Sequence, residues 1–97
     1  MSNQDTDNYY VSEVEIQNLK GLHARASAAL VKCACKFDAE ILVSREGEIV
    51  GGTSIMGLMM LAAGIGSTIT IETRGPEAKE ALSAIVDLIE NKFGEDQ

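Results

Sequence analysis

Two kinds of hydrophobic periodicity alternate along this chain, and they constrain its fold more than any other feature. In VSEVEIQ (11–17) and STITIE (67–72), apolar and polar residues alternate one by one, as in strands with one buried face. Elsewhere apolar residues recur every three or four positions, as on one side of an amphipathic helix. Strands with one solvated face need helices on the other face only. The pattern therefore predicts a sheet covered by helices on one side.

The element order follows from these periods and from the turn residues between them. It is β-α-β-β-α-β-α, which predicts an α/β (α+β) fold, an open-faced two-layer sandwich with a largely antiparallel sheet of four strands and three covering helices. The expected elements are a strand over 11–17, a helix over 24–37, strands near 41–43 and over 48–50, a helix within 53–66, a strand over 67–72 and a helix from 76 to 93.

A chain of 97 residues predicts one domain. Its first segment, MSNQDTDNYY, is polar and acidic, so we expect residues 1–9 to be a disordered tail and residues 10–97 to form the domain. The segment lacks the basic start and apolar middle of a signal peptide. We therefore expect a cytoplasmic protein, and we expect it to be a monomer.

One uncharged stretch resembles a membrane span in length. From Ile49 to Ile71 there are 23 residues without a charge, long enough to cross a bilayer. The stretch contains five glycines and five Ser or Thr residues, which divide it into a strand end, a helix and a strand. We therefore expect no membrane insertion.

Charge is distributed unevenly along the chain. The net charge of −7 argues against nucleic-acid binding, which needs clustered Lys and Arg. Residues 20–36, however, carry four cations and no carboxylate, so this segment is +4 and the rest of the chain −11. Such a segment is either a solvated basic helix face or a positive field that attracts acidic partners and phosphate.

The two cysteines predict no metal or redox site. Cys33 and Cys35 form a C-x-C pair within the first expected helix, where positions two apart point to different faces. This spacing suits neither a C-x-x-C redox motif nor a four-ligand zinc site. We expect free thiols and no bound metal.

The only histidine, His23, immediately precedes the first helical stripe. A lone histidine can be a surface or packing residue, but as a helix N-cap it lies where the first backbone N–H groups have no helical partner. The amides of Ala24, Arg25 and Ala26 then form an anion site, and Arg25 adds a guanidinium suited to phosphate oxygens. Imidazole is a competent nucleophile near neutral pH. Together these residues suit a phosphorylated histidine.

The chain lacks the motifs of an enzyme that activates its own substrate. It has no second histidine, no P-loop pattern, and no H-E-x-x-H or G-x-S-x-G motif. We therefore expect a carrier without a cofactor, which turns over no small-molecule substrate alone and depends on partner proteins for its phosphoryl group.

Two separated motifs, GLHARAS (21–27) and SIMGLMMLA (54–62), resemble the HPr family of phosphocarriers of the bacterial phosphotransferase system. The resemblance runs from about Val11 to Phe93, and HARAS is similar to a branch found in some proteobacteria. It implies a four-stranded antiparallel sheet under three helices. It also implies that His23 is phosphorylated on Nδ1 with help from Arg25, that enzyme I is the donor, and that an EIIA-type protein is the acceptor.

One position departs from the family pattern. The family usually has proline after the arginine, where this chain has Ala26. Alanine is a good helix former, so the helix should persist, but the first turn loses the rigidity that proline gives.

The second motif contains Ser54, which matches the family's regulatory serine. The resemblance implies phosphorylation by HPr kinase/phosphorylase, and a phosphate dianion at a helix N-terminus is electrostatically favoured. Serine is also a common helix cap, and either Ser54 or Thr53 can fill that role here.

Four large apolar residues, Ile55, Met56, Met59 and Met60, then follow in a helix too short to bury them all. Flexible methionines on an exposed patch suit a surface that meets several partners. We expect some of the four, Met59 among them, to pack in the core. The resemblance places Ile55 and Met56 in a docking face beside His23, and we assign Leu22 and Met59 to that face as well.

Two other kinds of function compete with a histidine phosphocarrier. One is a regulatory binding module controlled through Ser54, in which His23 is idle, but family members of that type typically lack the histidine. The other is an unrelated α/β domain that binds a small molecule, for which the sequence shows no pocket residues.

Overall fold

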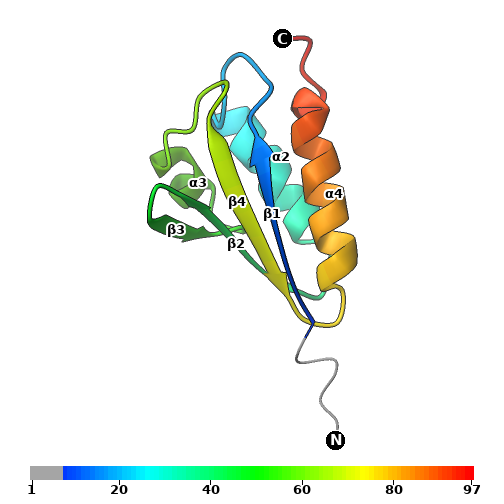
Figure 1. The fold of residues 1–97 in the computed structure, drawn as a ribbon. Coiled ribbons are helices and arrows are strands. Elements are labelled where there is room, and N and C mark those ends of the chain that lie inside the picture. The colour runs from blue at the N-terminus through cyan, green and yellow to red at the C-terminus, as the bar shows by residue number, and fades with distance from the viewer. Residues whose placement is uncertain (1–7) are drawn as a thin grey trace, which may run out of the picture.

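The computed structural model describes residues 8–97, and a four-stranded sheet forms one of its two layers (Figure 1). The strands lie in the order β1-β4-β2-β3, and all neighbours are antiparallel. Val14 of β1 pairs with Ile69 of β4, and Ile71 of β4 pairs with Val43 of β2. The strands are β1 (Tyr9–Glu15), β2 (Glu40–Arg45), β3 (Glu48–Gly51) and β4 (Thr68–Arg74).

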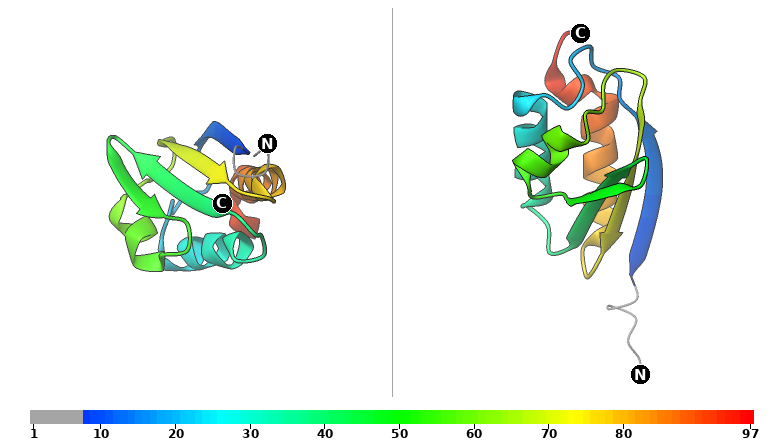
Figure 2. Two further views of the ribbon diagram at one scale, coloured as in Figure 1. Left: turned by 90° about the horizontal axis from the view of Figure 1, so that it is seen from below. Right: turned by 90° about the vertical axis from the view of Figure 1, so that its left-hand side faces the viewer.

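Helices cover one face of this sheet and leave the other open (Figure 2). They are α2 (Ala24–Ala34), α3 (Ile55–Met60) and α4 (Ala78–Glu90), with a short 3₁₀ turn, η1 (Lys92–Gly94), after α4. The open-faced sandwich with an antiparallel sheet of four strands and three helices is therefore confirmed.

The core is aliphatic and lies between the sheet and the helices. Alternation along β4 sends Ile69, Ile71 and Thr73 inward, and the Thr73 hydroxyl donates a hydrogen bond of 2.8 Å to the carbonyl of Ala78 at the start of α4. Strand alternation and the helical stripes therefore meet in one cluster. Its largest members without exposed surface are Ile16, Leu30, Val43, Leu58, Ile69, Ile71, Ile85 and Ile89.

Element boundaries differ from expectation at two places near the start of the domain. Tyr9 belongs to β1, where it pairs with Arg74, and not to the tail expected over residues 1–9. The rest of that tail, up to Asp7, lies outside the described residues. Helix α2 ends at Ala34, three residues before the expected end, although Phe37 still packs against the core.

The last helix also ends earlier than expected. We predicted a stripe reaching Phe93, but α4 stops at Glu90, and the side chain of Asn91 donates a hydrogen bond of 2.8 Å to the carbonyl of Asp87. Lys92 and Phe93 have positive φ values of 59° and 56°, which reverse the chain toward α2. Phe93 nevertheless packs against the core, so its apolar character was read correctly and its helical conformation was not.

The uncharged stretch from 49 to 71 folds as the end of β3, then α3, then most of β4. Among the described residues, no helix has the length and apolar character needed to cross a bilayer.

Candidate functional site

His23 is the N-cap of α2, as predicted. Its backbone is extended, with φ −73° and ψ −179°, and its carbonyl oxygen accepts the hydrogen bond of the Ser27 N–H at 2.8 Å. The His23 side chain makes no capping hydrogen bond to the helix. The N–H groups of the first turn are therefore left for another acceptor, in the place where a helix attracts anions.

The loop before His23 is held by backbone contacts with the segment that follows α3. Gly21 has φ +63°, and a Cβ at this position would lie 2.3 Å from the carbonyl oxygen of Ala63. The Leu22 N–H donates to that same oxygen at 2.9 Å. From α2, the buried hydroxyl of Ser27 donates to the Leu22 carbonyl at 3.1 Å. These bonds determine where His23 lies, and the role of Ser27 had not been predicted.

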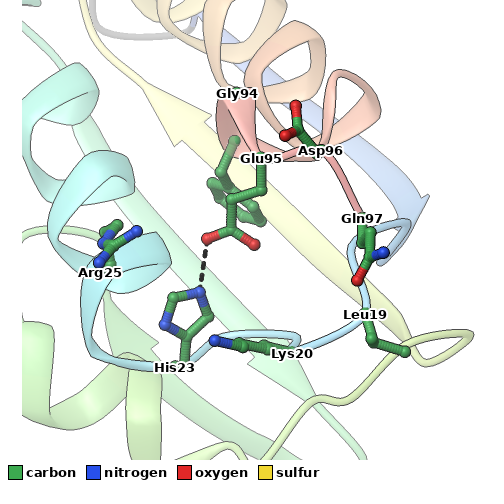
Figure 3. Close-up of a pocket in the computed structure, with 9 residues that line it drawn as sticks. Leu19, Lys20, His23, Arg25, Gly94, Glu95, Asp96 and Gln97 are labelled. Atoms are coloured by element: carbon green, nitrogen blue, oxygen red, sulfur yellow. Dashed lines mark hydrogen bonds and ion pairs between the residues drawn. The ribbon is translucent and has the colours of Figure 1, made fainter.

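The imidazole of His23 is hydrogen-bonded to Glu95, in the segment after η1 (Figure 3). Nε2 of the ring lies 2.5 Å from Glu95 Oε2. The other carboxylate oxygen, Oε1, accepts from the side-chain amide of Asn18 at 3.0 Å, and that amide also donates to the Gly21 carbonyl at 2.9 Å. Sequence analysis had missed both Glu95 and Asn18, because His23 and Glu95 are 72 positions apart and no local pattern links them.

The surroundings of Glu95 keep it ionised. Burial favours its neutral form, but hydrogen bonds from His23 and Asn18, together with the charges of His23 and Arg25, outweigh burial and lower the pKa of Glu95. An ionised carboxylate can only accept hydrogen bonds, so the ring must donate through Nε2. In the neutral imidazole, the free lone pair is then on Nδ1.

A cleft of about 510 Å³ lies over this side of the histidine. The loop residues Leu19 and Lys20, the first turn of α2 and the chain from 93 to 97 line it. Lys20 and Arg25 bring two cations to its wall, and the side chain of His23 is 26% exposed. The ring is therefore accessible to a partner beside two cations, and the carboxylates of Glu95 and Asp96 line the same cleft.

The three predicted phosphate-binding amides differ in accessibility. Ala24 and Arg25 are exposed, whereas Ala26 has no exposed surface and packs below the first turn. Of these three residues, Ala24 and Arg25 are therefore at the surface and Ala26 is not.

Helix α3 begins differently from α2. Its N-cap is Ser54, and not the alternative Thr53, because the Ser54 hydroxyl oxygen accepts the Gly57 N–H at 2.9 Å. Ser54 is exposed, so its hydroxyl is accessible from solvent.

Four exposed apolar side chains follow Ser54 and form what we call the α3 patch: Ile55, Met56, Met59 and Met60, with exposed fractions of 41%, 71%, 40% and 69%. Leu58 is the only buried residue of α3. Met59 is therefore part of the surface, and the expectation that it packs in the core is wrong.

Met59 and His23 line one shallow hollow of about 310 Å³, so the patch adjoins the histidine. Leu22, which we had assigned to the docking face, is 5% exposed and belongs to the core cluster. Its side chain is held in the interior between the sheet and the helices, and the α3 patch does not include it.

The two cysteines are free thiols. Cys35 is exposed, and Cys33 is half-buried. Burial raises the pKa of the Cys33 thiol, an effect that the charge of Lys36 reduces. Among residues 8–97, no group of three or more potential ligands of the kinds His, Cys, Asp and Glu comes together.

Comparisons with known proteins identify the family of this chain. The family described as the PTS HPr component phosphorylation site matches residues 11–91. The phosphocarrier protein HPr of Cupriavidus necator is 54% identical over 86% of this chain and 93% of its own, and that of Neisseria meningitidis serogroup A is 49% identical over 84% and 92%. The crystal structure of HPr from Thermoanaerobacter tengcongensis, 41% identical, superposes with a TM-score of 0.87 over 91% of this chain and 99% of that one. The chain is therefore a member of the HPr family of phosphocarrier proteins of the phosphotransferase system.

Proposed function

We propose that this chain accepts a phosphoryl group from phospho-enzyme I on Nδ1 of His23 and passes it to an EIIA-type protein. The observation that carries the proposal is the bond between Nε2 of His23 and the ionised Glu95, because it leaves Nδ1 as the ring nitrogen with a free lone pair. Membership of the phosphocarrier family supports the same reaction.

The transfer needs no external acid or base. The lone pair of Nδ1 forms the new P–N bond, and the bond between phosphorus and the donor atom of phospho-enzyme I breaks, with its electron pair staying on the donor. In this proposal the amides of Ala24 and Arg25, the positive end of α2 and the guanidinium of Arg25 offset the charge of the phosphoryl group.

The experiment that tests this function is labelling with ³²P from phosphoenolpyruvate and enzyme I. We expect the wild-type chain to take up label that is stable in base and lost in acid, and to release it when an EIIA-type protein is added. The variant His23→Ala should take up none, while Ser54→Ala serves as a matched control and should label normally. Undiminished labelling of His23→Ala would exclude His23 as the acceptor.

The same experiment decides between the carrier and a purely regulatory module. If the wild-type chain remains unlabelled but still binds enzyme I or a kinase, the chain acts as a binding module.

We also propose that Ser54 is a regulatory phosphorylation site for HPr kinase/phosphorylase. Its hydroxyl is exposed at the start of α3, where phosphate oxygens could accept the Gly57 N–H in its place. The added charge would lie beside Ile55 and Met56 of the α3 patch, where a partner must displace water from it.

The variant Ser54→Asp tests this second proposal. A carboxylate should keep the helix capped, so the melting temperature should hold or rise slightly. Binding to enzyme I and phosphorylation of His23 should weaken, by less than true phosphorylation achieves, because aspartate carries only one negative charge. Unchanged affinity for enzyme I at low salt would leave Ser54 as a helix cap only.

A further inference from the structure

The chain after α4 turns back sharply to reach the histidine. Lys92 and Phe93 are consecutive non-glycine residues with positive φ, a conformation that the surrounding structure must hold in place. Phe93 packs against the core, and the carbonyl of Gln97 accepts the Leu19 N–H at 2.8 Å. The segment is thereby attached on both sides of Glu95, which is 17% exposed at its side chain.

We propose that Glu95, held by Asn18, is a positioning residue that keeps His23 protonated on Nε2 and stabilises the ring once Nδ1 is phosphorylated. This inference rests on the function proposed above and names a residue that acts on the acceptor without touching the phosphoryl group.

Asn18 holds the carboxylate of Glu95 in one position. The residue has no exposed surface, and its side-chain nitrogen donates both to the Gly21 carbonyl and to Glu95. Its Oδ1 is buried without a hydrogen-bond partner among the described residues. Burying Oδ1 without a hydrogen-bond partner costs the folded protein stability. The two bonds that the Asn18 side-chain nitrogen donates offset this cost. They connect the loop before His23 to the carboxylate that orients the ring.

The charge of the ring changes during transfer, and Glu95 faces that change. The form of the imidazole that can attack phosphorus is the neutral one, here with its proton on Nε2. When Nδ1 forms the bond to phosphorus, the ring becomes an imidazolium that still carries this proton, and the electron pair of the broken bond stays on the donor. The bond between Nε2 and Glu95 then joins two opposite charges and strengthens, which favours phosphorylated His23 over the free form. In the same way, a buried aspartate orients and stabilises the histidine of serine proteases.

The test compares Glu95→Ala and Glu95→Gln with Asp96→Ala, which removes the same charge from the neighbouring position. The first measurement is the ¹⁵N NMR spectrum of the His23 ring in the unphosphorylated protein. We expect protonation on Nε2 in wild type and Asp96→Ala, and a mixture of both tautomers in Glu95→Ala. The side-chain NH₂ signals of Asn18 should shift in Glu95→Ala and not in Asp96→Ala.

The second measurement is the phosphoryl-transfer equilibrium with phospho-enzyme I. Glu95→Ala should lower the equilibrium constant for phosphoryl transfer to His23 by about tenfold. This is the loss expected for one charge-assisted hydrogen bond at a partly exposed site. Glu95→Gln keeps an acceptor for Nε2 but not the charge. It should therefore keep the Nε2 tautomer, while its equilibrium constant for phosphoryl transfer should fall nearly as far as that of Glu95→Ala.

Retention of the Nε2 tautomer in Glu95→Ala, or an equal loss in Asp96→Ala, would overturn the positioning role even if His23 is the phosphoryl acceptor. If the tautomer depends on Glu95 but the wild-type protein takes up no phosphoryl group, the orientation of the ring by Glu95 stands and the proposed carrier function fails.

Discussion

The N-termini of α2 and α3 differ in how their free backbone N–H groups are satisfied. At α3, the Ser54 hydroxyl accepts the Gly57 N–H at 2.9 Å, so the helix satisfies one of its free amides with its own cap. At α2 the cap is His23, whose side chain makes no such bond and is directed to Glu95 instead. One helix end is closed by the chain, and the other is left open.

The N-terminus of α3 therefore has an ordinary structural cap, whereas the N-terminus of α2 has amides that a ligand can bind. A side-chain cap contributes about 1 kcal/mol to stability, and α2 forgoes it at His23. The open amides and the positive helix end are then free to bind an anion attached to the ring. The two ends can be tested against each other by exchanging or removing their caps.

The largest effect, on phosphoryl uptake, should come from the variant His23→Ser, which gives α2 a side-chain cap. The serine should cap the helix but cannot accept a phosphoryl group as imidazole does, so labelling by enzyme I should be lost entirely. Urea unfolding should find this variant about 1 kcal/mol more stable than His23→Ala, since both lack the bond to Glu95 and only serine restores a cap. Equal stability of the two variants would mean that the end of α2 is not open.

A smaller effect is expected from Arg25→Ala at the same helix end. The amides of the first turn remain, so phosphoryl transfer should continue at a rate about tenfold lower, the loss of one charge-assisted contact. Rapid-quench measurement of transfer from enzyme I provides the rate. Lys32→Ala, which removes an exposed cation from the last turn of the same helix, is the matched control and should transfer at the wild-type rate.

At α3, removal of the cap should affect stability alone. Ser54→Ala should lower the free energy of unfolding by about 1 kcal/mol, because the Gly57 N–H loses its acceptor. Thr53→Ala, a change at the neighbouring exposed residue, should stay within about 0.5 kcal/mol of wild type. If Thr53→Ala lost as much stability as Ser54→Ala, Ser54 would not be the residue that caps α3.

The smallest effect concerns the pH dependence of the bond that turns His23 away from its helix. The folded protein lowers the pKa of Glu95 below its ordinary value of 4.5. The resulting stabilisation is therefore present above pH 4.5 and is lost as the pH falls through the lower, folded pKa. Wild type should exceed Glu95→Gln in stability by about 0.5 kcal/mol above this window, and the difference should vanish below it. Thermal unfolding of both proteins as a function of pH measures this, and a difference that grows at low pH would contradict it.

The sequence was sufficient for the fold and for the position of the histidine because both depend on local patterns. The alternation in STITIE places Ile69 and Ile71 in the core, and the start of a helical stripe after His23 makes it the N-cap. The partner of the histidine depends on a reversal of the chain 72 positions later, where Lys92 and Phe93 adopt positive φ. Neither residue type predicts that conformation, so Glu95 could not be placed beside the ring.

Local sequence patterns also failed to predict burial at several residues near the site. Leu22 was assigned to the docking face by its neighbourhood to His23, but the next residue along a loop can point into the core, as Leu22 does with 5% exposure. Met59 was expected to pack in the core, yet α3 is so short that Leu58 is its only buried residue. Asn18 and Ser27 are polar residues with no exposed surface, which only their hydrogen bonds explain.

The close approach of Gly21 to Ala63 has a consequence for how this protein can vary through mutation. Any side chain at position 21 would place its Cβ 2.3 Å from a backbone oxygen, whereas a Cβ on Gly64 would meet nothing within 4 Å. Selection for the carrier should therefore remove substitutions at Gly21 almost as strictly as those at His23, while position 64 is free to drift. Because the contact joins the loop of the histidine to the chain leaving α3, His23 and the surface beside it would be inherited as one unit, with Gly21 as the position that keeps them together.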